Sequence, residues 1–362
     1  TARAMTAHEK TTDGVTSADE DVLRQCLAPV VAERFGGRSS IAAIRWRRFD
    51  LATSYRARVV TVHMDRGDAL DVFLKDFGFT ARAKDDPKRR REREVRVYRD
   101  VLERAPLDTA AYYGSVLDEP RRRLWLLLEF VDGTPVGYCD IARSWLPAVA
   151  ALGRLHGRFA SRADALAGCD FLVHHTADFF WSKVELAARC VSRIAPHLDH
   201  ELTAIARRYG PIVDVMMDQP RTLLHGGCRS TNILVNIASD PARVCIVDWE
   251  EAAFGAPLYD LAYLLDGIEP PTLDPLLDAH RREATAHGLP VPSRRIAKYV
   301  IDCFRLHMTF TMLAQGVLKG YDEKDMAKLL AIGGQLSDAV CGNTRPRGSR
   351  QAASPLEGGP VQ

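Results

Sequence analysis

The sequence predicts an α+β fold with two lobes, a small antiparallel β-rich lobe followed by a larger, mainly helical lobe. The chain has 362 residues, which is more than one hydrophobic core usually serves. β-Branched and aromatic runs bounded by turn residues dominate positions 41–130, whereas helical periodicity dominates after position 132. Hydrophobic residues make up 46% of the chain, so both lobes have enough apolar side chains to bury a core.

The first expected element is an amphipathic helix. Ser17 and Glu20 form a capping-box pattern at its start, and Gly36-Gly37 is a typical stop signal at its end. Residues 1–16 lack apolar periodicity, so we expect them to form a flexible arm.

The small lobe, residues 17–131, is expected to contain one antiparallel sheet and a charged helix centred on residues 94–102. The helix lies in a basic run, residues 84–99, in which glutamates recur at helical spacing. We interpret this run as a solvated helix face rather than a nucleic-acid or membrane surface. The expected strands are 41–49, 55–63, 69–77, 112–117 and 124–130.

The large lobe, residues 132–342, is expected to be helical apart from one hairpin. The hairpin pairs residues 233–236 with 244–247 around Ser239-Asp240-Pro241. The tail, residues 343–362, is rich in Pro, Gly and Ser and is expected to be disordered. Helices are expected at 142–159, 176–194 and 202–217, and from about 275 to 340.

Composition argues against several classes of function. The formal net charge is only +2, which does not favour a nucleic-acid partner. The eight cysteines form no CxxC pair, so a zinc site or disulfide framework is not expected, and free thiols fit a reducing cytoplasm. No apolar stretch is long enough to span a bilayer, so no membrane partner is expected either.

A first group of residues suggests a phosphate-binding cleft. Phosphoryl transfer depends on positioning and charge neutralisation, so it needs a lysine for the phosphates and a carboxylate that holds the lysine. Lys75 lies inside an expected strand, where alternation points it opposite Leu74, toward a cleft. Glu94 on the following helix is the expected partner, with Glu92 as the alternative.

A second group lies in the large lobe. Asp248, at the end of an expected strand, and Asn232 are the expected magnesium ligands. Asn232 belongs to the segment LLHGGCRSTNILVN, which has the form of a phosphotransferase catalytic loop. Five residues before Asn232 such a loop carries an aspartate that accepts the acceptor's proton, but this position is Gly227.

The nucleotide itself is expected to contact two further segments. Glu129 and Val131 lie in the segment Leu128-Glu129-Phe130-Val131, which ends an apolar strand where the lobes join, so their backbone groups are candidates to bind an adenine edge. The turn before residue 55 contains no glycine. The hydroxyls of Thr53 and Ser54 are candidates to donate to a phosphate there, and a plain polar turn is the alternative.

With these residues in place, the chain resembles the aminoglycoside phosphotransferase and choline kinase branch of the protein-kinase-like superfamily over roughly residues 40–340. The resemblance implies a bilobal fold, ATP bound between the lobes with Mg²⁺, and phosphorylation of a hydroxyl on a small molecule. It also implies that His225 braces the catalytic loop, that Asp260 anchors its backbone, and that Leu155-His156 belongs to the preceding helix. The motifs that carry it are His225-Gly226, Asn232-Ile233-Leu234-Val235, Val247-Asp248-Trp249-Glu250, Gly255, Pro257 and Asp260-Leu261-Ala262.

The chain departs from the family pattern most clearly at Gly227, and Arg229 stands where protein kinases usually carry a lysine that neutralises the transferred group. The glycine has an alternative explanation, because it would tolerate a left-handed backbone in a tight loop. Other acids near the loop do not share the offset of the missing carboxylate, so we expect them at the surface or behind the site. They are Asp214, Asp218, Glu250 and Glu251.

Two functions follow from this departure. The first is an ATP- and magnesium-dependent phosphotransferase with impaired or altered catalysis; a general base contributes roughly a hundred- to ten-thousandfold, so Gly227→Asp is predicted to raise turnover about a hundredfold or more. The alternative is a pseudokinase that binds a nucleotide or metabolite without phosphoryl transfer, or a different reaction in the same cleft.

Overall fold

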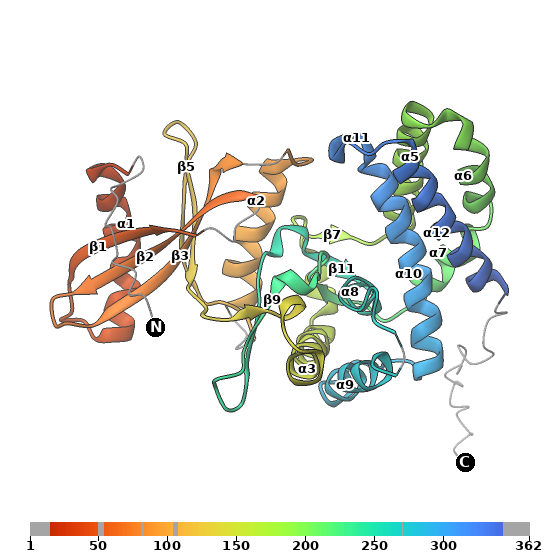
Figure 1. Ribbon diagram of the computed structural model, residues 1–362. Coiled ribbons are helices and arrows are strands. Elements are labelled where there is room, and N and C mark those ends of the chain that lie inside the picture. Colours follow the sequence, from red (N-terminus) through yellow and green to blue (C-terminus); the bar gives the residue numbers. More distant parts are fainter. Residues whose placement is uncertain (1–14, 50–53, 81–82, 104–107, 270, 343–362) are drawn as a thin grey trace, which may run out of the picture.

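The computed structural model describes residues 15–49, 54–80, 83–103, 108–269 and 271–342. It has the predicted α+β bilobal architecture, with a twisted antiparallel sheet in the small lobe and a mainly helical large lobe (Figure 1). All but the last two residues of the predicted flexible arm, and the whole predicted disordered tail, lie outside the described residues.

Helix α1 (Ser17–Phe35) is capped one residue earlier than predicted. Thr16 is the N-cap: its hydroxyl accepts the Asp19 N–H at 3.2 Å, and the Asp19 carboxylate accepts the Thr16 N–H at 2.8 Å. The predicted pair of Ser17 and Glu20 has the same spacing shifted by one residue, so sequence spacing alone did not distinguish the two. Gly36, with φ 90°, ends the helix as expected.

The small lobe contains one five-stranded antiparallel sheet in the order β1-β2-β3-β5-β4. Its two faces belong to different hydrophobic clusters, because side chains alternate along a strand. Leu127 packs on the face covered by Leu23 and Leu27 of α1, whereas Leu126 and Leu128 face the main core. The strands are β1 (Ile41–Arg48), β2 (Tyr55–Met64), β3 (Ala69–Thr80), β4 (Tyr112–Asp118) and β5 (Arg123–Glu129).

The charged helix of the small lobe begins earlier than the sequence suggested. Helix α2 (Pro87–Arg96) starts at a proline that needs no N–H partner there, and it continues as the π-helical turn η1 (Val97–Leu102). The predicted segment therefore forms its second half. Asp86 caps the start by accepting the Arg89 N–H at 3.2 Å.

Two small sheets position the candidate catalytic segments of the large lobe. After β5 the chain enters β6 (Thr134–Pro135), which pairs with the predicted hairpin of β9 (Ile233–Asn236) and β10 (Arg243–Ile246). The lobe boundary predicted after residue 131 falls between these sheets and remains a prediction.

The expectation of a single hairpin in the large lobe is wrong. A second small sheet has the order β7-β11-β8, with β11 parallel to β7 and antiparallel to β8. Strands of two or three residues are too short for an alternating pattern to show in the sequence. The strands are β7 (Val173–His174), β8 (Thr222–Leu224) and β11 (Ala253–Gly255).

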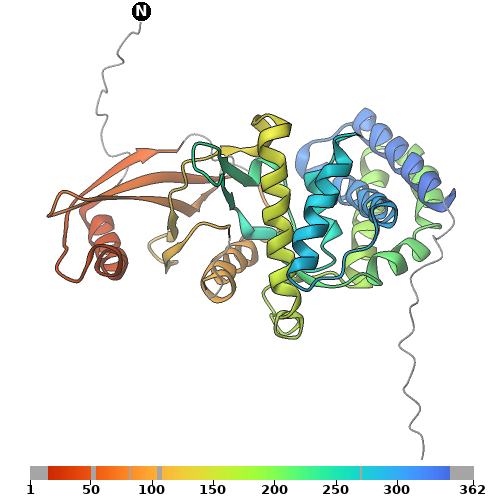
Figure 2. The ribbon, with the colours of Figure 1, turned by 90° about the horizontal axis from the view of Figure 1, so that it is seen from below.

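Helices make up the rest of the large lobe. The single helix predicted at 202–217 is two helices, because Gly210 and Pro211 start a new one. Helices α3 and α9 pack along each other, and α10 runs through the helical core (Figures 1 and 2). The principal helices are α3 (Ile141–Ala160), α5 (Ala177–Ile194), α6 (Asp199–Ala206), α7 (Gly210–Met217), α8 (Leu258–Leu264), α9 (Leu273–Ala286), α10 (Arg294–Ala314) and α12 (Glu323–Gly342), with short helices α4 (Ala163–Ala167) and α11 (Gly316–Lys319).

Within the described part of the chain, none of the helices combines the length and the apolar character needed to cross a membrane.

Candidate active site

Lys75 lies within β3, and its ammonium group is held between the two lobes. Its Nζ lies 2.7 Å and 2.9 Å from the two carboxylate oxygens of Glu94, so the ion pair predicted from the sequence is present. Both residues are buried, with 9% and 1% of their surfaces exposed. The alternative partner, Glu92, has a side chain that is 56% exposed and lies near Arg96 instead. Helix α2 therefore presents Glu94, and not Glu92, to the cleft.

Asp248 completes the arrangement from the large lobe. It follows β10 with φ 70°, a left-handed conformation that few non-glycine residues adopt. This conformation accompanies a 2.6 Å contact between Asp248 Oδ1 and Lys75 Nζ. Lys75 thus connects Glu94 in the small lobe with Asp248 in the large lobe.

The three charges change one another's pKa values. Burial raises the pKa of Glu94 to about 7, although Lys75 acts in the opposite direction. Burial also acts to raise the pKa of Asp248, but Lys75 outweighs it and lowers this pKa to about 2. Burial disfavours the charged form of Lys75, yet the two carboxylates dominate and raise its pKa. Lys75 is therefore a permanent cation at neutral pH.

Glu250 adds a third carboxylate beside this pair. Ligand atoms of Glu94, Asp248 and Glu250 all lie within 4.8 Å of one another, and carboxylate oxygens are the ligands that Mg²⁺ prefers. Lys84 forms an ion pair with Glu250, and Arg90 Nη1 lies 3.4 Å from Glu250 Oε1. Three carboxylates and three cations thus meet where the lobes face each other.

These cations correct our interpretation of the basic run as a solvated helix face. Arg93 is only 8% exposed; its guanidinium donates to the carbonyl oxygens of Phe171 and Glu250 at 2.8 and 2.6 Å. Arg90 and Arg93 are three residues apart, so they share the inward face with Glu94, whereas Arg89 is exposed.

The catalytic loop is anchored as the resemblance implied. The buried carboxylate of Asp260, in α8, accepts the N–H groups of His225 and Gly226 at 2.7 and 2.9 Å. His156 of α3 lies 3.1 Å from the same carboxylate, and the His225 ring lies 2.8 Å from the Val247 carbonyl oxygen. Charge-assisted bonds of this kind are roughly twice as strong as neutral ones, so they hold the loop in one position.

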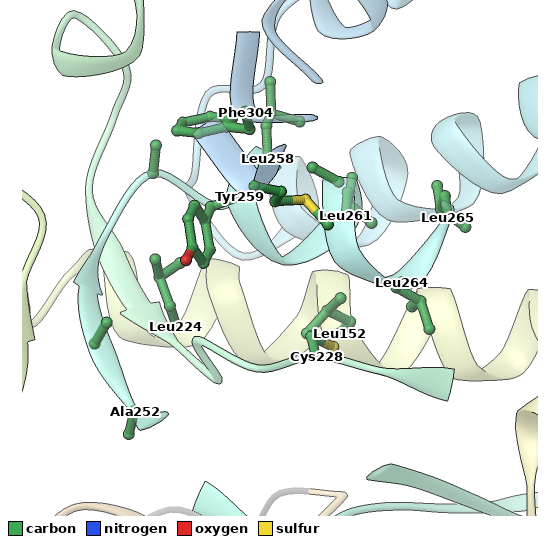
Figure 3. Packing of buried hydrophobic residues seen from close by; sticks show 14 of the residues in the cluster. Leu152, Leu224, Cys228, Ala252, Leu258, Tyr259, Leu261, Leu264, Leu265 and Phe304 are labelled. Atoms are coloured by element: carbon green, nitrogen blue, oxygen red, sulfur yellow. The ribbon is translucent and has the colours of Figure 1, made fainter. Parts of the chain in front are cut away.

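Packing fixes the other side of the loop. Cys228 is fully buried in the main core together with Leu152 of α3 and Leu264 of α8 (Figure 3). The residue between the anchored and the packed positions is Gly227, so its backbone has little freedom to move.

The two glycines of the loop have different requirements. Gly226 has φ 79°, and a Cβ atom there would overlap the Glu251 carbonyl oxygen. Gly227 does not have a positive φ, so the left-handed explanation applies to Gly226 and not to Gly227. A Cβ atom at Gly227 would instead lie 2.5 Å from Glu251 Oε2 and 3.2 Å from Glu251 Cδ.

The expectation that every nearby acid lies away from the missing aspartate is therefore wrong for Glu251. This residue ends the short 3-10 turn η5 (Trp249–Glu251), which folds back over the loop. Its Oε1 accepts a hydrogen bond from Arg90 Nη1 at 2.9 Å, and 30% of its side chain is exposed. A turn of three residues leaves no periodic pattern, and only the inward-facing Arg90 could have indicated a partner acid. Asp214 and Asp218 are exposed, as expected.

Asn232 and Arg229 lie on either side of the short turn after the loop. The Asn232 side-chain amide donates to the Gly227 carbonyl oxygen at 3.1 Å, and its backbone carbonyl accepts the Val247 N–H at 2.9 Å. Asn232 is thus bonded to the residue that precedes Asp248. Arg229 is exposed. Their predicted roles as metal ligand and phosphate-neutralising group remain predictions.

The segments expected to bind adenine and phosphate are partly described. The Glu129 N–H donates to the Ala111 carbonyl oxygen at 2.9 Å, and contacts of the Glu129 and Val131 backbone with an adenine remain predictions. Ser54 lies directly before β2 and its carbonyl accepts the Thr80 hydroxyl at 3.1 Å. Thr53 and the rest of that turn lie outside the described residues.

Beside Glu251 is a cavity of about 280 Å³, which both lobes line. Its walls are arginines of α2 on one side, and cationic and aromatic side chains of the large lobe on the other. The large-lobe walls include Phe179, Lys183, Arg229, Tyr259 and Tyr263. The cavity adjoins the loop that would carry the reactive group, which makes it the candidate acceptor pocket.

A sequence model described as "Phosphotransferase enzyme family" matches residues 50–294 of this chain. A search of the curated proteins finds no match. Solved structures that share the fold include choline kinase from Cryptosporidium parvum Iowa II, with 11% identity and a TM-score of 0.57. That alignment covers 90% of this chain and 97% of the kinase.

Two further phosphotransferase structures share the fold at similarly low sequence identity. The macrolide 2'-phosphotransferase from Brachybacterium faecium is 17% identical with a TM-score of 0.52, over 89% of this chain and 98% of that one. The GDP complex of aminoglycoside 2'-phosphotransferase-IIIa is 16% identical with a TM-score of 0.52, over 87% and 99%. At these identities the similarity establishes the fold alone.

Proposed function

Because this chain belongs to the phosphotransferase enzyme family, we propose that it transfers the γ-phosphoryl group of ATP to a hydroxyl of a small molecule. The observation that carries the proposal is the position of Lys75, which contacts Glu94 at 2.7 Å and Asp248 at 2.6 Å across the lobes. A lysine held in this way is placed to bind phosphate oxygens of a nucleotide. A non-functional cleft would not need to keep one buried cation between two carboxylates.

The donor set of the site fits Mg²⁺. Asp248 and Asn232 would hold the ion, with Glu250 nearby, because carboxylate and amide oxygens are the ligands that a hard divalent cation prefers. When bound, magnesium would neutralise the negative charge of the phosphates. Arg229, which is exposed and lines the candidate acceptor pocket, would neutralise charge on the transferred group.

The glycine at position 227 favours a second candidate function. Without the usual aspartate, the protein would bind ATP or a metabolite as a pseudokinase, or run a different reaction in the same cleft. One structural neighbour was solved with GDP, so the titration described below compares GTP with ATP as the nucleotide. The eight free thiols suit a reducing compartment such as the cytoplasm.

Calorimetric titration with ATP and with GTP, each with and without Mg²⁺, tests the proposal. We expect micromolar to millimolar affinity that depends on the metal, and loss of this metal dependence in Asp248→Ala. Asp214→Ala, which replaces an exposed aspartate of α7, is the matched control. If the unmodified protein binds neither nucleotide at millimolar concentration, the proposed function is wrong.

A further inference from the structure

We propose that Glu251 accepts the proton of the acceptor hydroxyl, in place of the aspartate that the loop lacks at Gly227. The inference rests on the proposed function, and it adds a catalytic residue that the loop motif does not contain. It starts from the coincidence of two features. The loop has no side chain at position 227, and a carboxylate from a different segment occupies the space beside it.

The distances support this exchange of roles. Glu251 Oε2 lies 2.5 Å from the point at which a Cβ atom of residue 227 would be. An aspartate at that position would place its own carboxylate only one further bond from Cβ. The carboxylate of Glu251 therefore lies in the region that the family's aspartate would occupy, although it comes from the turn after Asp248.

The two oxygens of Glu251 have different surroundings. Oε1 accepts the hydrogen bond from Arg90, which fixes the orientation of the carboxylate. Oε2 accepts no hydrogen bond from any residue that the structure describes, and the side chain lines the cavity beside Arg229. A general base needs a free lone pair directed at its substrate, and Oε2 provides one.

The reaction step balances with this residue as base. The acceptor oxygen attacks the γ-phosphorus of ATP while its proton passes to Glu251 Oε2. The new O–P bond forms as the bond between the γ-phosphorus and the β,γ-bridging oxygen breaks, and ADP leaves with the electron pair. Glu251 then returns its proton to water.

The proposal reverses the expectation for Gly227→Asp. The new side chain would push against Glu251 Oε2, and two adjacent carboxylates would each disfavour ionisation of the other. Activity should therefore not rise in the single variant. It should rise when the same change is combined with Glu251→Gln, because one carboxylate is then left in the right region.

Four variants test the inference: Glu251→Gln, Gly227→Asp, the combination of both, and Glu185→Gln as a control on the exposed face of α5. Phosphate release from Mg·ATP is measured with water and with a panel of hydroxylated compounds as acceptors, alongside the Kd for ATP. We expect Glu251→Gln to lower kcat by about a hundred- to ten-thousandfold with the ATP Kd within twofold. The double variant should regain at least tenfold in kcat.

Three results would overturn the inference. One is a Glu251→Gln rate equal to that of Glu185→Gln. Another is a large gain in Gly227→Asp alone, as the loop motif by itself predicts. The third is an unmodified protein that binds ATP yet transfers its phosphate neither to water nor to any acceptor, a result that leaves nucleotide binding intact. Loss of ATP binding itself would instead defeat the proposed function.

A separate observation, the charge of the cavity, indicates the chemical class of the acceptor. Five cationic side chains line the cavity against three carboxylates, namely Arg89, Arg90, Arg93, Lys183 and Arg229 against Asp85, Asp86 and Glu251. Arg90 is neutralised by Asp85 and Glu251, and Asp86 caps α2. Arg89, Lys183 and Arg229 form no ion pair with a carboxylate in the described part of the chain, although Lys183 also attracts Asp85 over a longer distance.

The cavity therefore favours a negatively charged acceptor. Its aromatic wall narrows the class further: the Lys183 ammonium group lies 5.5 Å from the centre of the Phe179 ring, and Phe179 stacks on His175 at 4.4 Å. Burial lowers the pKa of His175 well below its usual value, so this ring remains neutral. We infer an acceptor that joins a hydroxyl to an aromatic or apolar body and an acidic group.

Equilibrium titration with 4-hydroxyphenylacetate and with tyramine, a matched pair of opposite charge, tests this class without requiring turnover. We expect the anion to bind at least tenfold more tightly, and Lys183→Gln combined with Arg229→Gln to remove the difference. The exposed Lys324→Gln serves as control. Equal affinity, a preference for tyramine, or no binding of either compound at millimolar concentration would contradict the inference.

Discussion

The two halves of the interlobe site differ in how closely they keep the family's pattern. On the proposed nucleotide side, Lys75 contacts both Glu94 and Asp248. On the proposed acceptor side, the loop has no carboxylate at Gly227, and Glu251 from another turn lies beside that position. A phosphate-binding arrangement depends on several charges at once, so it tolerates little change. A proton acceptor needs only one oxygen in the right place, which a different segment can supply.

Removal of Lys75 should have the largest effect and should act on the nucleotide side. Lys75→Met leaves Glu94 and Asp248 as neighbouring carboxylates without their shared cation, so both phosphate binding and charge neutralisation suffer. We expect kcat/KM for ATP to fall by about a thousandfold or more. The measurement is steady-state phosphate release, with the exposed Lys328→Met as control. An unchanged rate would remove the distinction between the two halves.

Asp260 anchors the loop that both halves of the site share, so its removal should weaken ATP binding and phosphoryl transfer together. Asp260→Ala leaves the buried N–H groups of His225 and Gly226 without acceptors, which should lower the free energy of unfolding by about 3 kcal/mol. Urea denaturation measures this loss. ATP affinity and transfer should both weaken. A variant that lost only transfer would show that the loop anchor serves the acceptor side alone.

Substitution of the two adjacent glycines should have different effects, one mainly on stability and the other mainly on phosphoryl transfer. The Cβ atom that Gly226→Ala introduces would overlap a backbone oxygen, and residue 226 would have to keep its positive φ. This substitution should therefore destabilise the fold by about 2 kcal/mol. Gly227→Ala meets only the end of the flexible Glu251 side chain, so its loss of stability should be below about 1 kcal/mol. It should nevertheless lower transfer several-fold with ATP affinity unchanged, because Glu251 must move. Equal loss of stability in both variants would contradict this reading.

The last expected effect is gradual and concerns the proposed nucleotide side: the stability of the fold should depend on pH through Glu94. Glu94 has a pKa raised to about 7, mainly by burial, so the folded state holds its proton more tightly than the unfolded state. This contribution to stability is fully present below the unfolded pKa of about 4.3 and is lost as pH rises through about 7.

Glu94→Gln should remove this dependence. Between these pH values, the free energy of unfolding of the unmodified protein should fall relative to the variant by at most about 1.4 kcal/mol per pH unit. Denaturation at a series of pH values measures the difference. A slope of opposite sign would mean that Lys75, and not burial, dominates the ionisation of Glu94.

Much of the small lobe could be predicted because its signals are local. Alternation along β3 pointed Lys75 into the cleft, and the resemblance to the family's helix favoured Glu94, with Glu92 left as the alternative. The same reasoning was misleading for Arg90 and Arg93. A run of charges indicates a helix face, but only the packing of α2 against the large lobe decides which of those charges are buried.

The sequence by itself determined the α+β bilobal fold, the order of its main elements and the pairing of Lys75 with Glu94, whereas the contact of Lys75 with Asp248, 173 residues away, appeared only in the structure. The predicted features depend on periodicity and on motifs whose spacing is short. The tertiary structure alone decided that Gly226, and not Gly227, needs a left-handed backbone, and that Glu251 reaches the place of the missing carboxylate. The physical reason is that the loop and the turn that ends at Glu251 are 24 residues apart, from Gly227 to Glu251, and meet only through folding. Which oxygen lies beside which glycine depends on three-dimensional packing, and spacing along one segment does not contain that information.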